Sequence, residues 1–215
     1  FPETLKYLPK NKGINTGTPI RDMLYKGDSK KGIEICGFDN NKPIIMMMGG
    51  SLGSVKINTV LRKILPNLLK DFNVIHLCGK GNIDNSLIST PGYAQFEYVK
   101  NELKDIFAAS DLIISRAGAN AICEILTLRK PNILIPLSTA ASRGDQLLNA
   151  ASYEKQGFSK VLQEEKLTDK TLLSAVHEVY ANRKSYIYAM GQSTQTNGVQ
   201  IITDLIVETT PNVGK

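Results

Sequence analysis

Six residues between a buried apolar run and a helical pattern have the composition of a phosphate-binding loop. Residues 49–54 read Gly-Gly-Ser-Leu-Gly-Ser. Glycines such as Gly50 let the backbone approach an anion closely, while the Ser51 hydroxyl and the amides near Ser54 can donate to phosphate oxygens. A structural tight turn has the same composition, but a strand before the loop and a helix after it favour phosphate binding. The loop is neither a P-loop nor the full Gly-x-Gly-x-x-Gly fingerprint.

A second loop, residues 115–120, reads Ser-Arg-Ala-Gly-Ala-Asn and opens a predicted helix that carries Glu124. A carboxylate at this position could accept hydrogen bonds from two vicinal ribose hydroxyls. The alternative is a glutamate near the start of the helix that merely stabilises the helix dipole. The small residues at positions 117–119 leave room for a ligand and favour the binding interpretation.

A third loop runs through residues 138–149 into another predicted helix. Gln146 and Asn149 are three residues apart, so they share one helix face, and their amides suit the recognition of sugar hydroxyls. A capped helix with Asp145 as its cap or first-turn acid explains the same residues. The sequence leaves both interpretations open.

Groups that could transfer protons or bind metal are scarce. His76 falls inside a predicted strand and reads as a hydrogen-bonded core residue, and His177 falls on a late amphipathic helix. Neither histidine has an obvious acidic residue to orient it, so the sequence predicts no nucleophilic triad. The three cysteines stand in apolar runs without metal or disulfide spacing, so they read as buried small hydrophobes: Cys36, Cys78 and Cys123. We therefore expect no catalytic base, metal or cofactor in this chain.

Composition is typical of a globular protein, with 42% hydrophobic and 21% charged residues in 215. The net charge of +6 comes from dispersed lysines, and no basic and aromatic interleaving suggests nucleic-acid binding.

The longest apolar run, residues 44–48, is far shorter than the roughly 20 residues of a membrane-spanning helix. The chain begins at Phe1 without a leader pattern, and we expect it to be part of a longer cytoplasmic protein.

Strand and helix patterns alternate along most of the chain. The apolar runs predict strands at residues 43–48, 73–78, 95–99, 111–115, 132–136 and 159–162. The three- and four-residue spacings predict helices at residues 55–69, 101–109, 119–128 and 145–156, with a possible bend at Pro66. Thr168 is expected to cap a further helix, and residues 199–207 form a terminal one that could dock elsewhere.

This alternation predicts right-handed crossovers and a parallel sheet with helices on both faces, a Rossmann-like doubly wound α/β fold. We expect residues 1–40 to lead in from a preceding domain, residues 41–167 to form the nucleotide-binding unit and residues 168–215 to form C-terminal helices. In such a fold the ligand lies at the carboxyl ends of the strands, which is where all three loops fall.

Four runs together resemble the MurG family of bacterial peptidoglycan glycosyltransferases. They are TGTPIR at 16–21, GGSLGS at 49–54, SRAGAN at 115–120 followed by Glu124, and ASRGDQLLNA at 141–150. The resemblance implies the GT-B architecture, of which this chain is the C-terminal, donor-binding half. The family's N-terminal domain carries a Gly-Gly-His run whose histidine is thought to act in catalysis, and nothing like it occurs here.

The resemblance also implies roles for individual residues in binding the donor. Arg21, Gly50 and Ser51 match positions near the diphosphate. Glu124 matches the acid that binds the ribose hydroxyls. Three residues match the helix start beside the diphosphate and ribose: Ala119, Asn120 and Ala121.

Four more positions follow from the same resemblance. Gln146 and Asn149 match residues that contact N-acetylglucosamine. The uracil is expected near Val99, with Leu103 lining the same pocket.

The implied reaction is an inverting transfer of N-acetylglucosamine from UDP-N-acetylglucosamine to lipid I, which gives lipid II. It needs no metal in the site. The implied partners of the full-length enzyme are this donor, the lipid acceptor and, peripherally, the cytoplasmic face of the bacterial inner membrane. Two other readings stay open: a non-catalytic nucleotide-sugar-binding protein, and a related GT-B UDP-sugar enzyme with another acceptor.

Overall fold

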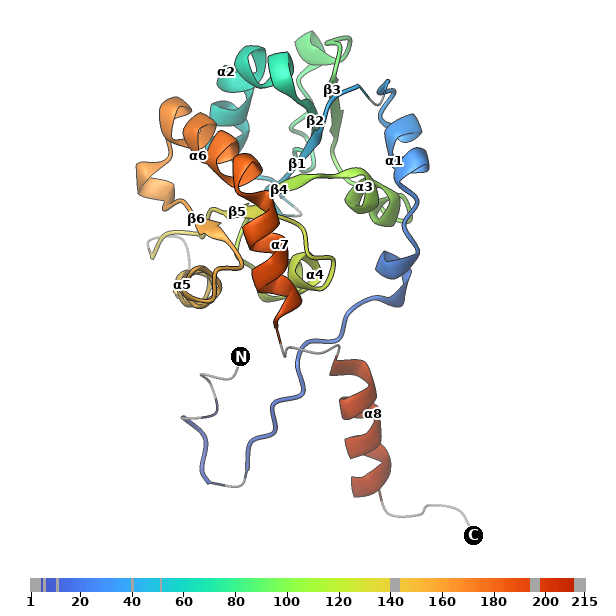
Figure 1. The fold of residues 1–215 in the computed structure, drawn as a ribbon, viewed down its shortest axis with the longest axis vertical. Coiled ribbons are helices and arrows are strands. Elements are labelled where there is room, and N and C mark those ends of the chain that lie inside the picture. The colour runs from blue at the N-terminus through green and yellow to red at the C-terminus, as the bar shows by residue number, and fades with distance from the viewer. Residues whose placement is uncertain are drawn as a thin grey trace.

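The structure is a computed structural model that describes residues 5, 7–10, 12–39, 41–50, 52–139, 144–193 and 198–210. Within these ranges the strands form a six-stranded sheet in the order β3-β2-β1-β4-β5-β6, and every pairing is parallel (Figure 1). The strands are β1 (Ile44–Met48), β2 (Asn73–Leu77), β3 (Tyr93–Phe96), β4 (Leu112–Ser115), β5 (Asn132–Leu134) and β6 (Lys160–Val161). The predicted doubly wound α/β fold is therefore confirmed.

Helices connect and cover these strands. The α-helices are α1 (Ser29–Ile35), α2 (Val55–Asp71), α3 (Leu103–Ala109), α4 (Ala119–Thr127), α5 (Asp145–Lys155), α6 (Asp169–Ala181), α7 (Arg183–Gly191) and α8 (Gly198–Thr209). Short 3₁₀ helices are η2 (Asp22–Lys26), η3 (Asn85–Leu87) and η4 (Glu164–Lys166).

The two faces of the sheet carry separate apolar clusters, as alternation along each strand requires. Ile45 and Met47 of β1 pack in the cluster that contains the buried residues of α2 and α6. Ile44 and Met46 face the other way, into the cluster formed with α3, α4 and α5. Because both faces are covered, the central strands are apolar at almost every position, which is why their sequences read as continuous hydrophobic runs.

Helix α2 forms for reasons visible in its sequence. Ser54 caps it by accepting from the Ile57 amide, and an apolar stripe including Leu61, Leu65 and Leu68 is buried against the sheet. The helix continues through the exposed Pro66 to Asp71, so it extends two residues beyond its predicted end.

The first 39 residues contain more structure than predicted. Helix α1 packs against α3 through Gly32, where an added Cβ would lie 2.2 Å from the Asp105 carbonyl oxygen. The Asp105 carboxylate also accepts from the Asp28 amide at 2.8 Å. This contact depends on a glycine rather than an apolar stripe, so hydrophobic periodicity does not reveal it.

Other boundaries also differ from the predictions. Strand β3 begins at Tyr93 and ends at Phe96, rather than spanning residues 95–99, because its register pairs Tyr93 with Val74 of β2. Strands β5 and β6 are shorter than predicted. Thr168 caps α6 in a capping box with Thr171, as expected.

Helix α8 lies apart from the layered core (Figure 1). The first residue of α8 is joined to the N-terminal part of the chain, because the Gly198 amide donates to the Thr18 carbonyl oxygen at 3.1 Å. Among the described residues, no helix has the length and apolar character needed to cross a membrane.

Candidate functional site

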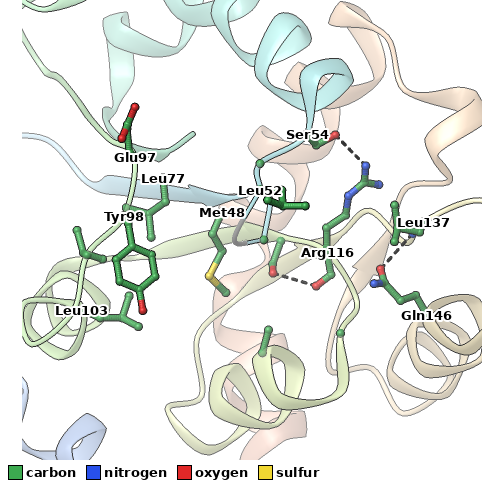
Figure 2. A pocket seen from close by; sticks show the side chains of 17 residues that line it. Met48, Leu52, Ser54, Leu77, Glu97, Tyr98, Leu103, Arg116, Leu137 and Gln146 are labelled. Atoms are coloured by element: carbon green, nitrogen blue, oxygen red, sulfur yellow. Dashed lines mark hydrogen bonds between the residues drawn. The ribbon is translucent and has the colours of Figure 1, made fainter. Parts of the chain in front are cut away.

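A pocket of about 520 Å³ opens at the carboxyl ends of β1, β2 and β4. This is where the strand order reverses between β1 and β4, the position at which doubly wound folds bind ligands. Figure 2 shows apolar side chains such as Met48, Leu77 and Leu103 beside a small number of polar ones. The pocket therefore combines an apolar wall with polar groups that could orient a ligand.

The loop between β1 and α2 forms one wall of the pocket. Gly49, Gly50, Gly53 and Ser54 all line it. Gly50 and Gly53 have φ values of 91° and 74°, and the Gly53 amide donates to the Gly50 carbonyl oxygen at 3.0 Å, closing a tight turn. Because this turn leads into the N-terminus of α2, amide groups and the positive end of the helix dipole lie beside the pocket. Ser51, predicted to donate to phosphate, lies outside the described residues.

This glycine loop is packed tightly against the end of β2. A Cβ on Gly53 would lie 2.0 Å from the Cys78 carbonyl oxygen, and one on Gly79 would lie 2.3 Å from the Gly53 nitrogen. Side chains at either position would push the two loops apart. The glycines are therefore required by the close backbone approach as well as by their positive φ angles.

Arg116 supports the same wall, a role that sequence reasoning missed. Its guanidinium donates to the Ser54 hydroxyl at 2.8 Å and to the Ile135 carbonyl oxygen at 3.2 Å, and it is paired with the Glu164 carboxylate. Figure 2 shows its side chain directed towards Ser54. Arg116 is only 9% exposed and lines the pocket, so it holds the cap of α2 from within the pocket wall. In the sequence, the only indication of this role was the position of Arg116 between a predicted strand and a turn of small residues.

The start of α4 forms the opposite wall. Gly118 is the N-cap and no side chain caps the helix there, so its first backbone amides are left available to a ligand. Gly118 and Ala121 line the pocket, while Ala119 and Asn120 are exposed on the same first turn.

Glu124 and Arg21, both predicted to bind the donor, contact each other. Arg21 Nε lies 2.9 Å from Glu124 Oε1 and Arg21 Nη2 lies 3.1 Å from Oε2, in a bidentate ion pair. The arginine side chain is 50% exposed and that of the glutamate 12%. The structure therefore brings these residues together across 103 positions in sequence, with each occupying the groups through which the other would bind a ligand.

Gln146 and Asn149 lie in the first half of α5 and both hydrogen-bond to the backbone. The Leu137 amide donates to Gln146 Oε1 at 3.1 Å, and Asn149 Nδ2 donates to the Ala117 carbonyl oxygen at 3.0 Å. Gln146 lines the pocket in Figure 2, whereas Asn149 ties α5 to the turn before α4. Asp145 is a first-turn acid, and Gly144 is the N-cap.

Val99 and Leu103, the expected uracil-pocket residues, line the pocket together with Tyr98 and Leu77. Tyr98 is 65% exposed, which leaves an aromatic face at the rim. These residues are brought together by the segment after β3 and the first turn of α3.

No general base is evident in the described part of the pocket. Its single lining carboxylate belongs to Glu97, which accepts from the Gly81 amide at 2.7 Å. His76 is fully buried in β2, and burial, reinforced by the nearby positive charge of Arg62, lowers its pKa to about 3. Within the described ranges there is also no group of three or more His, Cys, Asp or Glu residues that could hold a metal ion.

The expected core roles of His76 and of two cysteines are confirmed. His76 hydrogen-bonds through both ring nitrogens, while Cys78 and Cys123 are buried. Cys36 is half-buried. His177 lies on α6 with its ring centroid 5.8 Å from that of Phe72, remote from the residues that line the pocket.

Comparison with known proteins agrees with this architecture. The family model described as "Glycosyltransferase family 28 C-terminal domain" matches residues 44–206. The UDP-N-acetylglucosamine--N-acetylmuramyl-(pentapeptide) pyrophosphoryl-undecaprenol N-acetylglucosamine transferase of Lachnoclostridium phytofermentans is 58% identical over 208 residues, which are 97% of this chain and 59% of the relative. A protein of the same name from Lachnospira eligens is 55% identical over 96% of this chain and 58% of its own length. The chain thus spans less than two thirds of these relatives.

Solved structures show the same fold. The crystal structure of Acinetobacter baumannii MurG has a TM-score of 0.71 at 24% identity, over 94% of this chain and 58% of that chain. A kitacinnamycin glycotransferase has a TM-score of 0.65 at 18% identity, over 79% and 44% of the two chains.

Proposed function

This chain belongs to the glycosyltransferase family 28 C-terminal domain family, and we propose that it is the donor-binding part of a MurG-type transferase. Its pocket would bind UDP-N-acetylglucosamine, and the whole protein would transfer the sugar to lipid I to form lipid II. One observation carries the proposal: the glycine loop and the N-terminus of α2 open into a pocket at the reversal of strand order.

Within this proposal, the diphosphate lies against the glycine loop around Gly50, Ser51 and Ser54. Amides at the starts of α2 and α4, with residues 119–121 in the latter, favour its negative charge. Arg21, which is not among the lining residues, would be the cation that approaches the diphosphate. Because Arg21 and Glu124 are paired with each other, binding would require an exchange in which the arginine turns to the diphosphate and the carboxylate turns to the ribose hydroxyls.

The base and sugar occupy the remaining parts of the pocket in the same proposal. Val99 and Leu103 contribute the apolar surface beside the uracil, and Gln146 lies near the N-acetylglucosamine. Asn149 would contact this sugar only after releasing the Ala117 carbonyl oxygen, so its contribution requires a local rearrangement.

The reaction is proposed as a single displacement. An acceptor hydroxyl attacks the anomeric carbon, the bond to the diphosphate breaks, and UDP leaves with the electron pair. The helix N-termini and Arg21 stabilise the charge that develops on UDP. Removal of the hydroxyl proton is assigned to another part of the whole protein, because Glu97 is the single carboxylate among the described lining residues and is already bonded to Gly81.

We place the whole protein at the cytoplasmic face of the bacterial membrane, where a lipid-linked acceptor would be presented. The similarity to the named transferases supports this placement, since their acceptor is an undecaprenol-linked molecule.

Calorimetric titration with UDP-N-acetylglucosamine and UDP, without added metal, tests the proposal. We expect one saturable site of modest affinity, with ADP at the same concentrations as the matched control that binds more weakly. Absence of binding by UDP and UDP-N-acetylglucosamine at millimolar concentration would contradict the donor-binding assignment. We also expect that this chain alone does not transfer the sugar to lipid I. Turnover by this chain would refute the proposal that the catalytic base lies in another part of the whole protein.

A further inference from the structure

A chain of buried hydrogen bonds runs beneath the glycine loop. His76 Nδ1 lies 2.7 Å from the Tyr93 hydroxyl, and His76 Nε2 lies 3.0 Å from Asn58 Oδ1. Asn58 Nδ2 donates to the Cys78 carbonyl oxygen at 2.9 Å. The three side-chain partners are almost completely buried, with exposures of 0% for His76, 1% for Asn58 and 4% for Tyr93.

The last bond fixes the direction of the others. A flipped Asn58 amide would place its oxygen against the Cys78 carbonyl oxygen, so the nitrogen must face that carbonyl and Oδ1 must face His76. His76 Nε2 therefore carries a proton, and Nδ1 accepts from the Tyr93 hydroxyl. A neutral imidazole satisfies this arrangement, whereas an imidazolium would present a second donor to Tyr93.

The far end of this chain is the backbone on which the glycine loop rests. The Cys78 carbonyl oxygen is the atom that a Cβ on Gly53 would meet at 2.0 Å. Asn58 also belongs to the first turns of α2, where its backbone N–H donates to the Ser54 carbonyl oxygen at 2.8 Å. One side chain thus links the start of α2 to the end of β2, across the close contact that shapes the loop.

Neighbouring contacts brace the same place. Asn82 Nδ2 donates to the Leu52 carbonyl oxygen at 3.3 Å, which joins the loop after β2 directly to the glycine loop. Arg62 of α2 donates to the Asn82 carbonyl oxygen. The backbone after β2 is therefore held from both α2 and the glycine loop.

We propose that His76 is a positioning residue for nucleotide-diphosphate binding, which acts through Asn58 to hold the Cys78 carbonyl oxygen and hence the glycine loop. The inference rests on the proposed donor-binding function of that loop. An apolar residue would fill the same buried strand position, as Val74 and Ile75 do beside it, but would leave Asn58 Oδ1 without its histidine donor and the Asn58–Cys78 bond less firmly held.

Three substitutions in the 215-residue chain test the proposal. His76→Leu removes both ring bonds. His76→Gln places an amide N–H near the position of Nε2 and retains the donor to Asn58. Val179→Ala is the control, because Val179 is equally buried but lies on α6 and is not among the residues that line the pocket. Each is measured for UDP affinity and for amide hydrogen exchange at Gly53 and Asn82 in the free protein.

We expect His76→Leu to weaken UDP binding by about tenfold and to speed exchange at Gly53 and Asn82. His76→Gln should restore affinity to within about threefold of the natural chain. Val179→Ala should lower the melting temperature while leaving affinity and loop exchange unchanged. If His76→Leu fails to fold, Asn58→Ala cuts the final link and carries the same expectations.

Unchanged affinity and unchanged loop exchange in the folded variant would overturn the inference and return His76 to a purely structural role. The exchange measurement needs no ligand. If the natural chain does not bind UDP, the proposed function fails, while exchange at Gly53 and Asn82 still decides whether His76 orders the loop.

Discussion

The two walls of the pocket are held by different kinds of contact. The glycine-loop wall rests on buried groups, with Arg116 below Ser54 and the His76 chain below Cys78. Helix α4, whose start forms the other wall, carries the Arg21–Glu124 ion pair, which is not among the lining residues and whose arginine is half exposed. Buried networks are costly to disrupt, whereas an ion pair whose arginine is half exposed to solvent exchanges partners at a smaller cost.

If the pocket binds the donor as proposed, the two walls would contribute to binding in different ways. A diphosphate needs several donors already aimed at one place, which a rigid loop provides. Recognition of the ribose can instead use a carboxylate that is kept charged and oriented by a replaceable partner. We therefore expect substitutions in the first wall to affect both stability and binding, and those in the second to affect mainly binding.

Arg116→Met should have the largest effect on the glycine-loop wall. It removes the partner of the largely buried Glu164 carboxylate and of the Ser54 hydroxyl, so we expect a loss of about 3 kcal/mol in the free energy of unfolding. UDP binding should weaken as well, because the cap of α2 loses its support. Urea unfolding and calorimetry measure the two effects.

Lys160→Met is the matched control for that substitution. It removes the exposed Lys160–Glu178 pair, whose side chains are 35% and 45% exposed, and should cost less than about 1 kcal/mol. A cost for Arg116→Met no greater than that of the control would show that Arg116 does not support the wall.

Acid should weaken the same wall through His76. The folded protein keeps this histidine neutral, with a pKa of about 3, whereas an unfolded chain protonates it below about 6.5. The unfolded state therefore binds more protons between these values, and stability falls as the pH falls. From pH 6 to pH 4 we expect the protonation of this residue alone to lower the free energy of unfolding by about 2.5 kcal/mol.

Urea unfolding at several pH values compares the natural chain with His76→Gln, which has no ring to protonate. The free energy of unfolding of the natural chain should fall relative to that of His76→Gln as the pH falls. The other titrating groups are common to both proteins, so they do not contribute to this difference. Parallel profiles would show that His76 does not remain neutral in the folded protein.

Glu124→Gln should have the smallest effect on stability and a selective effect on binding. The substitution turns one acceptor into a donor, so affinity for UDP should fall by about tenfold. Stability should fall by less than about 1 kcal/mol, because the arginine that loses its partner is half exposed to solvent. Glu178→Gln, in the exposed pair on α6, is the control with unchanged affinity. Equal affinities in the two variants would leave Glu124 with a purely structural role.

Much of the fold followed from local patterns in the sequence. The buried strands read as apolar runs, and α2 showed both its stripe and its cap, so the alternation of strands and helices was predicted correctly. Helix α1 was missed because its contact with α3 is made by Gly32, whose importance depends on a neighbour 73 positions away in Asp105. Such close backbone approach leaves no periodic signal.

The contacts within the site were less predictable than its location. The three loops pointed to the carboxyl ends of the strands, because that position follows from topology. The pairing of Arg21 with Glu124 and the position of Arg116 beneath Ser54 join segments distant in sequence. His76 was predicted as a hydrogen-bonded core residue, but its partners Tyr93 and Asn58 become evident only when β2, β3 and α2 are assembled.

A crystal structure of this chain with UDP-N-acetylglucosamine tests the central claim most directly. We predict the diphosphate against the glycine loop at residues 49–54 and the N-terminus of α2, with the Glu124 carboxylate released from Arg21 and bonded to the ribose hydroxyls. A ligand ordered at another surface, or one in the pocket whose diphosphate lies away from the glycine loop, would contradict the account.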